Sequence, residues 1–289
     1  MTVGFVLVSL LGFTPSARAA SDGIDASAVV SFRTETDDAQ QAMGSWTPQR
    51  RAAALDATDA SAMKASAASA IPRAEQVLPV SHIGRIFYTQ NGSDYACSAN
   101  VVQAANQSTL ATAGHCLTQK QAWSTNIVFY PAYDSGESSY GAWPVIGGAT
   151  TPGWFENNDD QSDDTGFLAV GRNEAGEDIV SVVGASRVLF DHNTTAPASA
   201  YGYPASLRFD GEHLDRCRGV GEVVSAEQIA LRCDMNEGVS GGPIFAGDDA
   251  NAPHFANVAE RYNDYSHVLG PIWQDAEKSV YDTVAAISG

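Results

Sequence analysis

The sequence predicts an all-β fold, a barrel or a sandwich, that ends in a helix. From Val80 onward, short apolar runs recur between clusters of Gly, Asn, Asp, Ser and Pro, which is typical of strands joined by turns. The stretch 275–287 differs, because Val280, Val284 and Ala285 or Ile287 recur near the spacing of a helix. The apolar runs are 83–89, 95–102, 126–130, 166–170, 199–203 and 242–246.

Length and charge limit the classes of protein that this chain can represent. Its 289 residues are enough for one large or two small domains with a hydrophobic core. The formal net charge of −18 argues against nucleic acid and anionic membranes as partners, because both carry the same sign. Such acidity is typical of a protein that stays soluble outside the cell.

The first residues predict a secretory signal peptide. The apolar run 3–13 is too short to span a bilayer, and Ala17-Arg18-Ala19 follows it as a small-x-small cleavage pattern. We expect residues 1–19 to be this signal, cut after Ala19, and the mature protein to be secreted. No Lys or Arg precedes the run, and a buried N-terminal strand is the alternative interpretation.

The next segment, 20–76, predicts a propeptide or linker outside the core. It is rich in Ala, Ser, Thr and Asp, and its part 50–70 is low in complexity before Pro72 interrupts it. We expect a zymogen whose mature form begins between about residues 70 and 80. The polar, turn-rich stretch 172–178 divides the remainder into domains 77–178 and 179–289.

Four cysteines predict two disulfides in an exported chain. Three pairings are possible, and we favour the two that close short loops, Cys97–Cys116 and Cys217–Cys233. Each loop would contribute roughly 3 kcal/mol by chain entropy. No Cys-x-x-Cys or His-Glu-x-x-His spacing supports a zinc site, so we expect neither metal nor cofactor.

A glycine-rich turn around Ser240 is the first segment with catalytic character. In Gly238-Val239-Ser240-Gly241-Gly242-Pro243 the serine can expose its hydroxyl beside free backbone N–H groups. An acyl-transfer enzyme needs such donors where negative charge develops. An ordinary hairpin turn is the alternative for this segment taken alone.

His115 is the candidate base for that serine. A serine hydroxyl needs a base within hydrogen-bond reach, and histidine titrates in the suitable range. Cys116 follows His115 and can fix its segment to the strand that carries Cys97. A lone histidine more often fills a structural role, and that role is expected for the five others: His82, His192, His213, His254 and His267.

Asp164 is the candidate carboxylate that orients the base. It leads directly into the apolar run 166–170, where burial would let it accept the imidazole N–H and set the tautomer. Its neighbours Asp159, Asp160 and Asp163 are expected to form a solvated loop, since the spacing lacks the glycine and glutamate of an EF-hand.

Together, the segments 112–116 (TAGHC), 164–170 (DTGFLAV) and 238–243 (GVSGGP) resemble the His, Asp and Ser boxes of chymotrypsin-like serine peptidases. The likeness spans about residues 80–289 and points to the bacterial secreted branch that includes glutamyl endopeptidases. The strand 97–102 (CSANVV) is similar to the one that precedes the family's His box, and 46–50 (WTPQR) is similar to an actinobacterial propeptide motif.

The resemblance implies two antiparallel six-stranded β-barrels that meet at a cleft. His115 and Asp164 would come from the first barrel and Ser240 from the second, with an oxyanion hole formed by the N–H groups of Gly238 and Ser240. It also implies a disulfide between Cys97 and Cys116. Animal members carry an aspartate before the serine that binds the new amino terminus on activation. This chain has Val239 there, so we expect no such insertion.

Two residues are candidates for the specificity pocket. Counting back six residues from Ser240 gives Asp234, which would favour Arg or Lys at the P1 position of the substrate, and would make Arg73 a candidate autocatalytic site. Cys233 directly before Asp234 departs from the family pattern. The rival is glutamyl specificity, in which Arg261 on the run 257–261 would pair with an acidic P1 side chain.

We therefore expect a secreted serine endopeptidase that acts on protein or peptide substrates as a monomer. Two other classes are weighed against it. A catalytically inactive binding protein on the same fold would predict a broken triad, and none of the three positions is broken. An unrelated β-sandwich adhesin would leave the co-occurrence of the three boxes unexplained.

Overall fold

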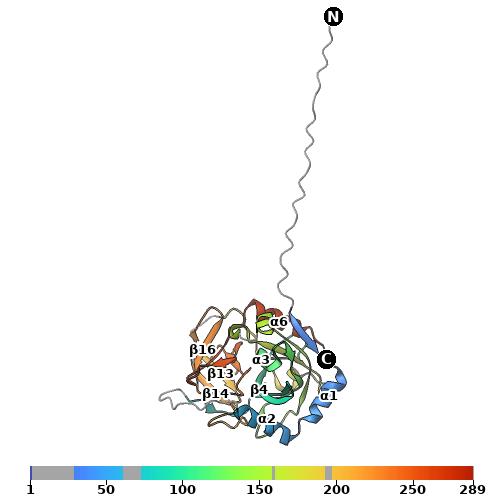
Figure 1. Ribbon diagram of the computed structural model, residues 1–289, viewed down its shortest axis with the longest axis vertical. Coiled ribbons are helices and arrows are strands. Elements are labelled where there is room, and N and C mark those ends of the chain that lie inside the picture. The colour runs from blue at the N-terminus through green and yellow to red at the C-terminus, as the bar shows by residue number, and fades with distance from the viewer. Residues whose placement is uncertain (2–28, 61–72, 158–159, 193–196, 289) are drawn as a thin grey trace.

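The computed structural model describes residues 1, 29–60, 73–157, 160–192 and 197–288, and places them in two β-rich halves with helices on the outside (Figure 1). The predicted signal peptide, apart from Met1, lies outside the described residues. None of the helices in these ranges combines the length and the apolar character needed to cross a membrane.

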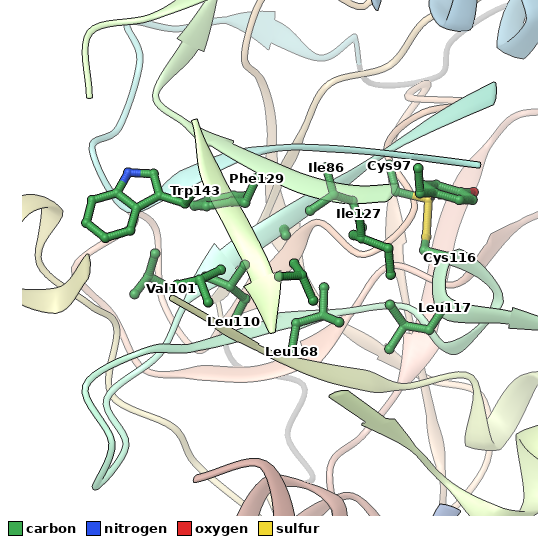
Figure 2. Close-up of a cluster of buried hydrophobic side chains, with 14 of the residues drawn as sticks. Ile86, Cys97, Val101, Leu110, Cys116, Leu117, Ile127, Phe129, Trp143 and Leu168 are labelled. Carbon is green, nitrogen blue, oxygen red and sulfur yellow. Dashed lines mark hydrogen bonds between the residues drawn. A yellow bond between two sulfur atoms is a disulfide. The ribbon is translucent and has the colours of Figure 1, made fainter. Parts of the chain in front are cut away.

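The first half is a closed barrel of six antiparallel strands. The order β11-β12-β5-β4-β3-β8 closes where β8 returns to β11, with Phe129 opposite Trp143. The barrel interior is filled by apolar side chains from alternate positions of these strands, among them Ile86, Leu110 and Leu168 (Figure 2). The strands are β3 (Ile83–Gln90), β4 (Ser93–Val101), β5 (Thr109–Thr112), β8 (Thr125–Pro131), β11 (Trp143–Thr150) and β12 (Gly166–Val170).

The second half divides its strands between two sheets. One has the order β18-β17-β13-β14-β2 and the other the order β15-β16-β20-β19. A bridge between Ala256 and Ile272 and the Cys217–Cys233 disulfide join them around a second apolar core. The strands are β2 (Glu75–Gln76), β13 (Pro197–Gly202), β14 (Asp215–Val220), β15 (Glu222–Val223), β16 (Gln228–Arg232), β17 (Pro243–Phe245), β18 (His254–Asn257), β19 (Glu260–Arg261) and β20 (His267–Pro271).

The predicted terminal helix is confirmed as α6 (Asp275–Ala285). The helix begins with a capping box between Gln274 and Glu277. The side chain of each residue accepts the main-chain N–H of the other. Its buried residues Val280 and Val284 pack with Phe167 of the first barrel. The helix therefore connects the end of the second half to the first.

The segment before residue 61 is not the detached linker that its composition indicated. Strand β1 (Val30–Arg33) pairs with β11, and the helices α1 (Thr36–Ser45) and α2 (Pro48–Ala60) cover the barrel (blue in Figure 1). Trp46 is 2% exposed, packs on Phe87 and donates its indole N–H to the carbonyl of Asn126 at 2.7 Å. The expectation that 20–76 lies outside the core is therefore wrong for residues 30–57. Residues 61–72, which include about half of the low-complexity part 50–70, lie outside the described residues.

The remaining elements are short and connect the strands. Three of them bear on the site below: α3 contains His115, η1 ends directly before Asp164, and α4 places Trp154 against the His115 ring. The short elements are β6 (Thr118–Gln119), β7 (Ala122–Trp123), β9 (Tyr133–Asp134), β10 (Glu137–Ser138), α3 (Gly114–Leu117), α4 (Pro152–Asn157), the 3-10 helix η1 (Gln161–Asp163) and α5 (Ile179–Val183).

Candidate active site

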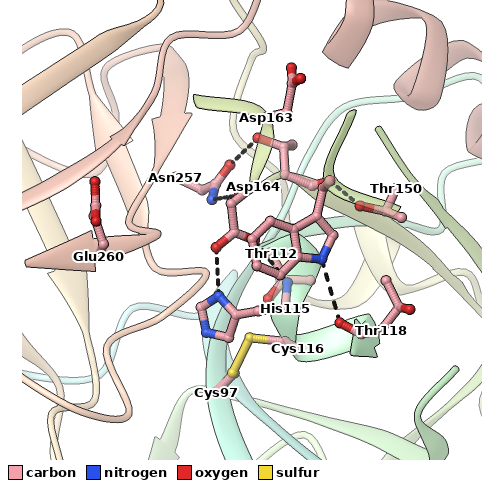
Figure 3. Close-up of polar contacts among 12 residues, drawn as sticks. Cys97, Thr112, His115, Cys116, Thr118, Thr150, Asp163, Asp164, Asn257 and Glu260 are labelled. Atoms are coloured by element: carbon pink, nitrogen blue, oxygen red, sulfur yellow. Dashed lines mark hydrogen bonds and ion pairs between the residues drawn. A yellow bond between two sulfur atoms is a disulfide. The ribbon is translucent and has the colours of Figure 1, made fainter. Parts of the chain in front are cut away.

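His115 and Asp164 come together because the strands that carry them are neighbours. β5 pairs antiparallel with β12, with Thr112 opposite Gly166, so the residues after β5 face those before β12. Asp164 is completely buried, whereas the His115 side chain is 30% exposed. One Asp164 carboxylate oxygen lies 2.7 Å from His115 Nδ1, and the other accepts the His115 main-chain N–H at 2.8 Å (Figure 3).

Asn257 holds Asp164 from the second half of the molecule. Its side-chain amide donates to the Asp164 carbonyl at 2.9 Å (Figure 3). Its side-chain oxygen accepts from Thr165 Oγ1 at 2.7 Å and from Trp273 Nε1 at 3.0 Å. The amide therefore uses both its oxygen and its nitrogen, and it connects β18 to the start of β12. Sequence reasoning did not identify Asn257, because nothing local to the run 257–261 marks a contact with residues more than ninety positions earlier.

The surroundings of His115 favour its protonated form. Burial of the ring lowers the pKa of His115. The charge of Asp164 and its hydrogen bond raise it, and together they outweigh the burial, so the pKa lies above the ordinary 6.5. Asp164 also determines the tautomer, because an ionised carboxylate accepts only from a protonated Nδ1. Nε2 is then the ring atom left free to accept a proton.

The predicted disulfide Cys97–Cys116 is formed directly after the base. It joins β4 to α3 and so restrains the segment that carries His115. Within the described ranges, the only grouping with metal-ligand spacing is Cys97, His115 and Cys116. The two sulfurs are bonded to each other, so the group offers a metal only the imidazole.

Ser240 lies on the loop between β16 and β17, against the strand end that leads to His115. The Ser98 main-chain N–H donates to the Ser240 carbonyl at 2.7 Å, and Gly241 N–H donates to Val258 at 2.7 Å. Gly241 has φ +78°, and a side chain there would collide with Thr112 Oγ1 and the Ser98 carbonyl. Only a glycine after Ser240 therefore lets this loop approach the first barrel so closely.

Ser98 joins the two halves through its main-chain N–H and its hydroxyl. Besides its N–H bond to Ser240, its hydroxyl donates to the Gly238 carbonyl at 2.9 Å and accepts from Tyr203 N–H at 3.0 Å. Its carbonyl accepts from Thr112 Oγ1 at 2.9 Å. Ser98 follows Cys97 in β4, so the disulfide, the approach to His115 and the Ser240 loop all meet at this strand.

The backbone around Ser240 presents two unused donors. Gly238 has φ +91°, and a side chain there would come within 2.6 Å of the Tyr203 carbonyl. In the described part of the chain, neither the Gly238 nor the Ser240 main-chain N–H donates to a protein acceptor, whereas Val239 N–H between them donates to Asn236. Two free N–H groups, one on the serine and one two residues before it, are the arrangement that binds an oxyanion.

A pocket of about 270 Å³ opens beside Ser240. Arg261 lies in its wall, paired with Glu237 and stacked 3.9 Å over the Tyr265 ring. Burial raises the pKa of Glu237. Hydrogen bonds from Arg261, its own backbone and Ser206 lower it and together outweigh the burial, so the pKa lies below its ordinary value and Glu237 is held in its charged form. The lining residues are Asn236, Glu237, Val239, Ser240, Val258, Ala259, Glu260 and Arg261.

Asp234 is not in this pocket, which corrects the expectation of an aspartate at its base. Its carboxylate points to Arg208, whose Nε and Nη2 donate at 2.9 Å, and it accepts the main-chain N–H of Ala74 at 2.7 Å. The count of six residues assumed the loop of trypsin-like members, and the Cys217–Cys233 bond draws this residue toward β14 instead.

Comparison with known proteins gives no match to a family model and none to a curated protein. Among solved structures, the protease Anisep from Arthrobacter nicotinovorans is 35% identical over 74% of this chain and 100% of its own, with a TM-score of 0.70. The thermostable serine protease AL20 from an extremophilic microorganism is 33% identical over 72% of this chain and 98% of its own, with a TM-score of 0.68. A Glu endopeptidase at 17% identity covers 74% of this chain and 97% of its own, with a TM-score of 0.60, and shares the fold.

Proposed function

The chain belongs to the bacterial chymotrypsin-like serine proteases related to glutamyl endopeptidases, and on this premise we propose that it hydrolyses peptide bonds with Ser240, His115 and Asp164. The observation that carries the proposal is the grip of Asp164 on both the ring and the backbone of His115. A base fixed at two points, and a serine with two free N–H donors on a loop bonded to the strand beside that base, are suited to acyl transfer.

In the proposed reaction, Ser240 Oγ attacks the peptide carbonyl carbon while His115 Nε2 takes the hydroxyl proton. The carbonyl oxygen becomes an oxyanion, which the N–H groups of Gly238 and Ser240 bind. His115 returns the proton to the leaving amine as the C–N bond breaks, and an acyl-enzyme on Ser240 remains. A water molecule, deprotonated by the same ring, then releases the acid and restores the serine.

We propose that the pocket beside Ser240 binds the P1 side chain and disfavours an acidic one. Arg261 is already paired with Glu237, and Glu260 adds a second carboxylate to the wall. A P1 glutamate would have to replace Glu237 on the guanidinium, whereas a cationic P1 side chain meets an excess of negative charge. The negative charge that favours a basic P1 in this proposal therefore comes from Glu260, while Glu237 neutralises Arg261, and Asp234 has no part in it.

We propose that the protease works outside the cell as a monomer on protein or peptide substrates. Two disulfides support an oxidising compartment. Mass analysis of the protein exported by its host would test this, and a mature form retained in the cytoplasm would contradict it.

A fluorophosphonate probe tests the catalytic proposal directly. We expect covalent labelling at Ser240, located by peptide mass spectrometry, and none in Ser240→Ala. Hydrolysis of casein by the parent, lost in the same variant, would accompany it. A correctly folded parent that is neither labelled nor active would indicate the inactive binding protein instead.

A further inference from the structure

Asp234 and Arg208 together hold the backbone of Ala74. It accepts the Ala74 N–H at 2.7 Å and binds Arg208 through two nitrogens. The same Arg208 donates from Nη2 to the Ala74 carbonyl at 2.9 Å. The N–H and the carbonyl of Ala74 are therefore both bound by the charged pair of Asp234 and Arg208.

Ala74 marks the point where the chain enters the second core. It is 6% exposed and belongs to the apolar cluster that contains Met235 and Val239, whereas Arg73 directly before it is exposed. After Ala74, β2 pairs with β14, and Glu75 forms ion pairs with Arg216 and Arg218. The chain from Ala74 onward is thus anchored at several points, and the bond before it lies at the boundary with solvent.

We propose that the Arg73–Ala74 bond is the maturation site and that Asp234 receives the new amino terminus. An endopeptidase that cleaves after arginine would add one water across this bond, leaving a carboxylate on Arg73 and an ammonium on Ala74. The ammonium nitrogen is the present amide nitrogen, so it forms beside the carboxylate without movement of the anchored strand. An amide offers Asp234 one hydrogen, whereas an ammonium offers three and a full charge.

The charges around Asp234 favour this product. Asp215, which is buried, is close enough to interact electrostatically with both Arg208 and Asp234. Before cleavage, two carboxylates share one guanidinium, and afterwards they share a guanidinium and an ammonium. The added positive charge lowers the energetic cost of keeping the buried Asp215 ionised beside Asp234.

The site also lies where such a pair can affect catalysis. Asp234 is two residues before Asn236, which lines the pocket. The Asn236 side chain accepts the Ser206 main-chain N–H and donates to the Ser206 carbonyl. Gly238 and Ser240 follow on the same loop. Val239 stands where animal members use a carboxylate for this purpose, and Asp234 supplies one five positions earlier.

The test uses the full chain with Ser240→Ala and added trypsin, so that its outcome does not depend on the proposed proteolytic function. Limited digestion followed by N-terminal sequencing should give Ala74 as the first residue. A matched control carries one extra alanine inserted between residues 73 and 74. It is cut at the same arginine, but its ammonium forms one residue away from Asp234.

We expect the digested parent to melt at least about 3 °C above the digested control, since a gain of 1 kcal/mol shifts Tm by roughly 2–4 °C in a protein of this size. In the Asp234→Asn background the difference between parent and insertion should vanish, which separates the pairing from any general damage by the substitution. A first residue other than Ala74, or equal melting of the digested parent and control, would overturn the proposal.

Discussion

Asp164 binds His115 at two points, with one carboxylate oxygen on the ring at 2.7 Å and the other on the main-chain N–H at 2.8 Å. The two bonds have different effects. The first sets the tautomer of the ring, and the second sets where the short helix α3 begins. Because Asp164 is completely buried, neither bond competes with water.

Removing a member of this group should cost several orders of magnitude in kcat. Asp164→Asn keeps the shape but favours the wrong tautomer, and a loss of roughly 10³–10⁴-fold is expected. Ser240→Ala and His115→Ala should each be at least as severe, and their combination hardly worse, because they act as one unit. Asp163→Asn is the neighbouring control and should retain most activity. A larger loss in Asp163→Asn than in Asp164→Asn would contradict the assignment.

Activity should fall on the acid side with an apparent pKa above 6.5. The ring must be neutral to accept the serine proton, and Asp164 raises the pKa of His115, so the ring keeps its proton to a higher pH. Kinetic profiles of kcat/KM between pH 4 and 9 would measure this. The half-buried His213, which contacts Asp134 and Asp210, provides a control, and His213→Gln should leave the profile unchanged. Half-maximal activity at pH 5 or below would count against His115 as the base.

Much of this architecture is predictable because the signals for it are local. The apolar runs 83–89, 126–130 and 166–170 became barrel strands, since short apolar runs bounded by turn residues indicate a strand without reference to distant residues. The terminal helix followed from spacing alone. The pairing Cys97–Cys116 was favoured by loop length and is formed.

The features that the sequence did not predict depend on contacts between distant segments. Trp46 stands alone among Ala, Ser and Asp, so its burial against Phe87 and Asn126 leaves no periodic pattern. Asn257 gains its role from Asp164 in the other half. Asp234 was placed by counting residues, and the partners that turn it away, Arg208 and Ala74, come from a distant loop and from the segment expected to be removed.

Trp46→Ala should destabilise the full chain by about 3–5 kcal/mol, because it leaves a cavity in the packing of α1 against the barrel. Urea unfolding followed by far-UV circular dichroism would measure the change. Gln41→Ala, on the exposed side of the same helix, should stay within roughly 0.5 kcal/mol of the parent. Equal stability of the two variants would mean that the segment contributes nothing to the fold.

Glu237→Gln should shift the preference of the pocket toward acidic P1 residues. It removes the charge that neutralises Arg261, so the guanidinium becomes available to a substrate carboxylate. The ratio of kcat/KM for matched Glu and Arg peptides should rise roughly tenfold, which corresponds to about 1.4 kcal/mol. Adding Arg261→Gln should abolish the rise. If the ratio is the same in all three proteins, this pocket does not read P1.

Ser98 determines how the protein should respond to heat. Flexible catalytic loops open at temperatures at which the remaining structure is still intact, and activity is then lost before the protein melts. Here the Ser240 loop and the approach to His115 are bonded to the same residue of a buried strand. Inactivation and loss of ellipticity should therefore follow one curve. In Ser98→Ala, which loses the two hydroxyl contacts, inactivation should come several degrees before melting.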